Sequence, residues 1–122
     1  MNNAALMCLT KDNFCLLKEC KRLFIYSDLY VYENFPKAKK HLKIMYFDEC
    51  EELIENIIMA NNSEKSIRKK YQVNALLNIS KIDFLITYFY DLKIVHKKRY
   101  LSVIRILSNV KGLLIGWINE PN

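Results

Sequence analysis

The sequence predicts an all-α fold, an antiparallel up-down four-helix bundle, and three observations lead there. Glycine and proline number only two each, too few for the turns that β-sandwiches need about every 8–12 residues. Hydrophobic residues make up 52% of the chain. This share is enough to form a core and argues against a disordered chain. Apolar residues recur with helical spacing in four long segments, and the connections between them are short. Residues 1–122 are expected to form a single domain, because there is no internal repeat or linker.

The first predicted helix begins at Thr10 or Asp12 and ends at Glu33. Residues 1–9 are expected either to extend this helix or to be disordered. Pro36 disfavours helix at the residue before it and suits the first position of the next helix. The apolar stripe, which includes one serine, is Leu16, Leu17, Cys20, Leu23, Phe24, Ser27, Tyr30 and Val31.

The second predicted helix runs from Pro36 to Ala60, and the third continues to Leu92, with Ser63 as its expected N-cap. The stripe of the second helix is Leu42, Met45, Cys50, Leu53, Ile54, Ile57 and Ile58. The stripe of the third is Tyr71, Ala75, Leu76, Ile79, Ile82, Leu85, Ile86 and Phe89. Both stripes follow the period expected of a helix with one face in a core.

The fourth predicted helix, residues 97–119, is apolar over roughly 200° of its circumference, where a surface helix of a bundle needs only about 100°. Gly112 and Gly116 lie on the remaining arc, although a glycine inside a helix costs roughly 1 kcal/mol relative to alanine. A smooth strip of this kind admits either a neighbouring segment of the same chain or a second subunit, and the wide apolar arc favours the second subunit. Trp117 is then an interface anchor, or alternatively an ordinary core tryptophan.

The net charge of +6 indicates an anionic partner, with nucleic acid as the first candidate and an acidic protein or a membrane surface behind it. The alternative is a soluble lysine-rich domain from an AT-rich genome. Three basic clusters stand out, at residues 37–43, 65–70 and 96–99, and the first and third should meet at one end of the bundle. Lysines outnumber arginines in them, which favours phosphate contact over base readout. The candidate nucleic-acid-binding residues are Lys37, Lys39, Lys40, Lys43, Lys69, Lys70, Lys97, Lys98, Arg99 and Arg105.

No pattern for catalysis, a cofactor or a metal is found in the sequence. The four cysteines include no C-x-x-C pair, and neither His41 nor His96 is spaced to join them as a ligand. The acidic run at residues 48–52 is expected to be a solvated face, or a contact for a basic patch on a partner protein. The chain lacks a signal-peptide pattern, and the apolar stretch FLITYFY is far too short to cross a membrane. The sequence therefore predicts a non-enzymatic, cytoplasmic protein that does not bind a membrane.

Two stretches, YVYENFPKAKK at residues 30–40 and GLLIGWI at residues 112–118, resemble the accessory variability determinant (Avd) family of diversity-generating retroelements. The likeness extends from about Lys21 to Asn119. It departs from the family pattern after Pro-Lys, where Ala38 stands, and on the third helix, where Asp83 and Thr87 stand near positions that often hold arginine. Lys93 replaces a loop glycine before the last helix. Four-helix proteins encoded in intervening sequences of ribosomal RNA share the general pattern.

The resemblance implies a non-catalytic accessory protein that binds a reverse transcriptase and template RNA through a basic surface. It implies a ring-like homo-oligomer, a homopentamer, that supports cDNA synthesis in mutagenic retrohoming. The alternative is an oligomeric adaptor that recruits a protein partner without nucleic acid. Gly112, Gly116 and Trp117 are the candidate interface residues in either case.

Overall fold

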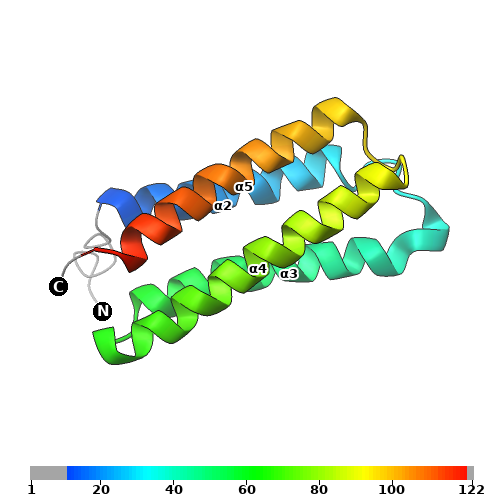
Figure 1. Ribbon diagram of the computed structural model, residues 1–122. Helices are drawn as coiled ribbons and strands as arrows, with labels where there is room; N and C mark the ends of the chain where they lie inside the picture. The colour runs from blue at the N-terminus through cyan, green and yellow to red at the C-terminus, as the bar shows by residue number, and fades with distance from the viewer. Residues whose placement is uncertain (1–10, 121–122) are drawn as a thin grey trace.

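The structure, a computed structural model, describes residues 11–120, with side chains from residue 15 onward. Residues 1–9, which are expected to extend the first helix or to be disordered, lie outside the described residues. The described chain contains four α-helices, a short 3-10 helix and no strand (Figure 1). The helices are α2 (Lys11–Tyr30), α3 (Lys40–Asn61), α4 (Lys65–Asp91) and α5 (Lys97–Ile118), and the 3-10 helix is η1 (Lys37–Lys39). The predicted all-α class is confirmed.

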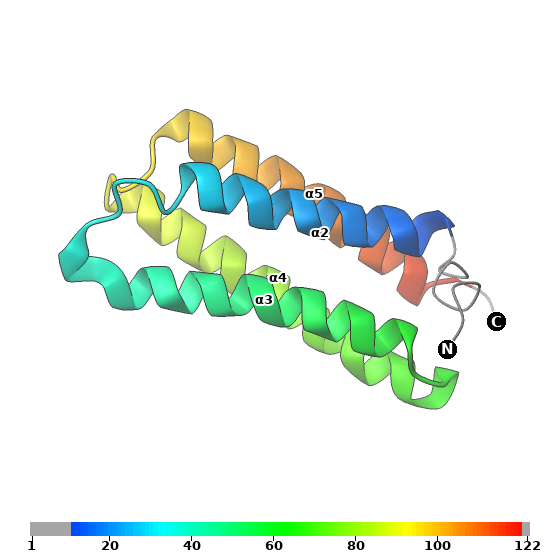
Figure 2. The same cartoon turned by 180° about the vertical axis from the view of Figure 1, so that it is seen from behind.

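Each helix packs against two others, in the circular order α2, α3, α4, α5 and back to α2. The pairs α3 with α4 and α2 with α5 pack most extensively, whereas α3 and α5 are not neighbours. Both views place the α2–α3 and α4–α5 connections at one end of the molecule (Figures 1 and 2). The start of α2, the end of α5 and the α3–α4 connection lie at the other end.

The predicted apolar stripes form the core with few exceptions. Met45 and Ile58 of the predicted second stripe are instead exposed, and Tyr46, which the prediction omitted, is fully buried. Tyr46 packs its ring 5.6 Å from that of Phe89, and its hydroxyl hydrogen-bonds that of Ser27 at 2.8 Å. A tyrosine can stay in a core when its hydroxyl has such a partner. The core of α3 therefore lies partly on a different face from the predicted one.

Helix boundaries differ from the predicted ones mainly at the first connection. α2 ends at Tyr30 rather than at Glu33, and Pro36 precedes the 3-10 turn rather than opening α3. The predicted N-cap of α4 is also wrong. Ser63 donates its hydroxyl hydrogen back to the Met59 carbonyl oxygen at 2.6 Å, so Glu64 takes the cap position without a side-chain cap bond.

The end of α4 is closed by Lys93, which has a φ of 62°. Its amide donates to the Tyr90 carbonyl, and the amide of Ile94 donates to the Phe89 carbonyl at 2.8 Å. This pair of bonds is the Schellman motif, whose left-handed residue is usually glycine. A glycine would adopt this backbone conformation without the steric penalty that Lys93 meets.

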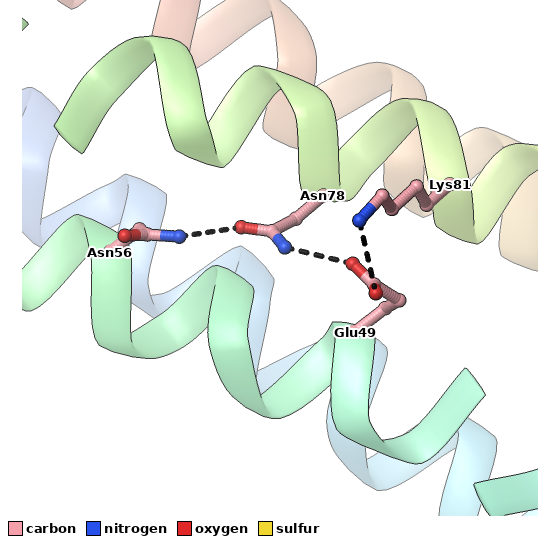
Figure 3. Close-up of polar contacts among 4 residues, drawn as sticks. All are labelled: Glu49, Asn56, Asn78 and Lys81. Atoms are coloured by element: carbon pink, nitrogen blue, oxygen red, sulfur yellow. Dashed lines mark hydrogen bonds and ion pairs between the residues drawn. The ribbon is translucent and has the colours of Figure 1, made fainter. Parts of the chain in front are cut away.

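The contact between α3 and α4 contains a chain of polar side chains (Figure 3). Asn78 is only 4% exposed. Its side-chain oxygen accepts a hydrogen bond from Asn56 at 2.7 Å, and its nitrogen donates to Glu49 at 2.8 Å. The second carboxylate oxygen of Glu49 lies 3.6 Å from the Lys81 ammonium. Both functional groups of the buried amide are therefore paired, which fixes the register of the two helices.

Candidate nucleic-acid interface

The first and third basic clusters lie at the same end of the molecule, where α3 and α5 begin (Figure 1). We call this set the end patch. Its members are Lys37, Lys39, Lys40, Lys43, Lys97, Lys98 and Arg99. All seven side chains are exposed or half-buried. Among the described residues, none of them lies within ion-pair distance of a carboxylate.

The helix ends beneath the end patch add to its positive potential. The first turns of α3 and α5 contain no acidic residue, and neither N-terminus is capped by a side chain. The free amide groups of a helix N-terminus carry partial positive charge. The Arg99 guanidinium lies 4.0 Å from the centre of the Tyr30 ring, a cation–π contact that orients it. The carboxylates nearest in sequence to this patch are those of Glu33, Asp48 and Asp91, all exposed.

Arg68 of the middle basic cluster makes structural contacts within the chain. Arg68 donates hydrogen bonds to the carbonyl oxygens of Ala60 and Ser63 at 3.2 and 3.3 Å. Its guanidinium also lies 5.7 Å from the centre of the Trp117 ring. Arg68 is thus a structural residue that ties the α3–α4 connection to α5. Lys69 and Lys70 are exposed at the end of the molecule opposite the end patch.

Four other predicted residues lie on α5. Arg105 is exposed in the middle of the helix, away from the end patch. Trp117 is only 5% exposed and belongs to the hydrophobic core, which is the alternative that the sequence left open for it. Gly112 and Gly116 are exposed. An added Cβ at either glycine would meet no described atom within 4 Å, so close packing within the described chain does not explain them.

A groove of about 1040 Å³ runs between α2 and α5, and Gly112 forms part of its wall. Lys18, Lys21 and Arg22 line it from α2, followed along the same helix by the exposed apolar side chains of Ile25 and Leu29. We call this feature the α2/α5 groove. The sequence predicted a smooth strip on the last helix, but not that α2 would supply the opposite wall.

The two buried thiols are poorly suited to nucleophilic or metal chemistry. Burial raises the pKa of the Cys20 thiol from 9.0 to about 12, and burial also raises the pKa of Cys50. Such thiols stay protonated and are poor nucleophiles and ligands. Within residues 11–120 no three His, Cys, Asp or Glu side chains come together as metal ligands do.

One apolar feature was not predicted. Val73, Leu77, Phe84 and Tyr88 form an exposed stripe along α4, and the Phe84 side chain is 72% exposed. The i, i+4 spacing within each half of the stripe is visible in the sequence. The sequence analysis assigned only one apolar stripe to this helix, the core stripe, because that stripe is longer and more regular.

Among the described helices, α5 is long and apolar enough to cross a membrane by length and composition, with a mean hydropathy of 1.5 over its best window. A core helix of a soluble bundle passes the same test, and α5 buries six residues in the core, Val103, Ile106, Leu107, Val110, Leu114 and Trp117.

Comparisons with protein families, with curated proteins and with solved structures give no match. The resemblance to the Avd family stays a prediction from the residues that carry it.

Proposed function

We propose that this chain is a non-catalytic accessory protein of a diversity-generating retroelement. In this proposal it acts in the cytoplasm as an antiparallel up-down bundle assembled into a ring-like homo-oligomer. It binds the reverse transcriptase and template RNA through a basic surface and supports mutagenic cDNA synthesis. The positions of the helix ends in Figures 1 and 2 support the antiparallel arrangement. The GLLIGWI and ENFPK stretches support the family.

The observation that carries the RNA-binding part is the end patch. Seven cationic side chains and two uncapped helix N-termini meet at one end, with no ion pair among the described residues to neutralise the seven. Lysines on helix ends bind phosphates as point charges and release the counterions of the RNA. Six of the seven residues are lysines, so the patch suits the RNA backbone rather than a particular base sequence.

The test is a variant with Lys39→Glu, Lys40→Glu, Lys97→Glu and Lys98→Glu. We expect it to lose measurable affinity for single-stranded RNA, while the wild type binds and weakens steeply between about 50 and 200 mM salt. Fluorescence anisotropy against salt measures both quantities. The matched control reverses four lysines elsewhere, at Lys65, Lys69, Lys70 and Lys111, with the same change in net charge. Equal binding by the end-patch variant and the wild type would refute the assignment, and so would an equal loss in the control.

The reverse-transcriptase part has its own test. Wild-type protein should raise the yield of cDNA from the element's template RNA when it is added to the purified reverse transcriptase. The end-patch variant should not. Genes for a reverse transcriptase and a near-repeat pair are expected beside the gene for this chain.

A second candidate function, an adaptor that recruits a protein without nucleic acid, is favoured by the exposed α4 stripe. An aromatic ring as exposed as that of Phe84 is typical of a protein contact rather than of a solvated surface. Absence of any RNA affinity at low salt, together with loss of partner binding in Phe84→Ser, would favour the adaptor.

A further inference from the structure

We propose that the α2/α5 groove of one copy holds the exposed face of α3 from a second copy, in a head-to-tail contact. The inference rests on the homo-oligomeric part of the proposed function and specifies which surfaces meet. It concerns the long sides of the molecule, whereas the end patch lies at one end. Assembly and RNA binding can therefore be tested apart.

Along α2, the wall of the groove is first positively charged, at Lys18 to Arg22, and then apolar, at Ile25 and Leu29. Glu19 is paired with Arg22 at 3.3 Å, which leaves Lys18 and Lys21 as groove cations without an ion pair among the described residues. Ile25 and Leu29 continue the same wall and are about half exposed, at 47% and 51%. A cationic, partly apolar groove fits an occupant that is acidic and partly apolar.

The exposed face of α3 has that chemistry. Residues 44–62 contain no lysine or arginine. Four acidic side chains, Asp48, Glu51, Glu52 and Glu55, are exposed on it, and no described base pairs with them. Apolar side chains adjoin the acidic run on both sides, Ile44 and Met45 before it and Ile58 and Met59 after it, each 40–51% exposed. We call this surface the acidic face of α3.

The two surfaces also match in spacing. On α2 the apolar Leu29 and the cationic Lys18 are eleven residues apart, and on α3 the apolar Ile44 and the anionic Glu55 are eleven apart. Both separations correspond to about 16 Å along a helix. When the apolar ends meet, the carboxylates therefore come to lie beside the ammonium groups.

Gly112 explains how a helix could come close enough. A neighbouring helix approaches most closely where side chains are absent, and the space beside Gly112 is empty of described atoms. Gly112 then costs the single copy some helix stability and gives room to the second copy.

A second copy suits the groove better than two other occupants. RNA would match its charge but would leave Ile25 and Leu29 facing phosphates. The α4 stripe of a second copy would match the apolar part, but α4 exposes only two carboxylates, Asp83 and Asp91, against four on the acidic face of α3. The groove lies between α2 and α5 and the acidic face belongs to α3, so they are separate surfaces of one chain. Each copy therefore has one of each surface to offer, and copies add head to tail until the assembly closes.

The experiment is a charge swap measured by sedimentation of the full chain. One variant carries Lys18→Glu and Lys21→Glu, a second carries Glu52→Lys and Glu55→Lys, and a third carries all four changes. All four positions are exposed, and circular dichroism checks that each variant folds. We expect an assembly larger than a dimer for the wild type, a 14.5 kDa monomer for each double variant, and recovery of the assembly in the fourfold variant.

The matched controls are Asp83→Lys on α4, which should keep the wild-type mass, and Phe84→Ser, which tests the α4 stripe. Wild-type mass in both double variants would overturn the proposal. A monomeric fourfold variant would also overturn it, as would a monomeric or dimeric wild type or dissociation caused by Phe84→Ser. Loss of RNA binding in the end-patch variant bears on the proposed function alone, because those residues lie outside both surfaces.

Discussion

At the scale of single residues, Lys93 occupies a backbone position that penalises most side chains with a Cβ. Its φ of 62° lies in the left-handed region, where L residues other than glycine, asparagine and aspartate lose about 1–2 kcal/mol. The Schellman bonds from Lys93 and Ile94 hold it there, because without them the last carbonyls of α4 would lack partners. Lys93 is thus a point of backbone strain that the end of α4 requires.

We expect Lys93→Gly to raise the free energy of unfolding by about 1 kcal/mol, since glycine adopts this conformation without a steric penalty. Urea unfolding followed by circular dichroism measures the change. Asn34→Gly is the matched control, because Asn34 has a φ of 60° but asparagine tolerates the left-handed region. Its gain should be smaller. A lower stability for Lys93→Gly would show that the position carries no strain.

The surroundings of the two α5 glycines and of Arg68 could not be predicted from the sequence. The two glycines of α5 were identified from the cost of glycine in a helix, and the exclusion of an intrachain contact came only from the space around them. The role of Arg68 could not be predicted from its cluster of lysines. Its partners are a carbonyl at the end of α3 and a ring at the end of α5, far apart in sequence.

At the scale of elements, the pairing of α3 with α4 depends on the buried amide of Asn78. Removing that amide leaves the Asn56 nitrogen and a Glu49 carboxylate oxygen without their partner. A partly buried polar group that loses its hydrogen bond costs about 1–3 kcal/mol.

We therefore expect Asn78→Ala to lower the free energy of unfolding by about 1–3 kcal/mol. Asn74→Ala, one turn earlier on the exposed side of the same helix, should change it by less than about 0.5 kcal/mol. Denaturant unfolding of both variants gives the comparison. Equal effects at the two positions would mean that the polar chain of Figure 3 does not hold α3 and α4 together.

Periodicity predicted the number of helices and most of their inner faces, because a 3.6-residue period over twenty or more residues is a strong signal. It placed the ends of α3, α4 and α5 each within one residue of the observed ends. It misassigned the start of α3, because a proline is compatible with both a helix start and a 3-10 turn. Pairing of α2 with α5, and hence the α2/α5 groove, depends on contacts across the bundle that no local pattern encodes.

At the scale of the whole molecule, several core groups lose their buried environment together when the chain unfolds. Burial raises the pKa of Cys20, Cys50, Tyr32 and Tyr46, so these groups ionise at lower pH in the unfolded chain than in the folded one. Their contribution to stability is complete below the unfolded thiol pKa of 9.0 and is lost as the pH rises toward the folded values.

We expect the free energy of unfolding to be level up to about pH 8.5 and to fall steadily from there to about pH 11. Urea unfolding at a series of pH values measures this dependence. Cys20→Ala should flatten the fall, because it removes one of the groups whose pKa burial raises. Constant stability up to pH 11 would show that the thiols and phenols are not held protonated by the core.

The placement of the end patch gives the molecule an electrical asymmetry along its length. Seven cationic residues lie where α3 and α5 begin, against three exposed lysines, Lys65, Lys69 and Lys70, where α4 begins at the opposite end. A polyanion approaching in dilute salt would turn such a molecule end-on before any contact forms, and would speed their encounter. An RNA captured in this orientation would touch the tips of the helices, and the flanks would stay open for proteins.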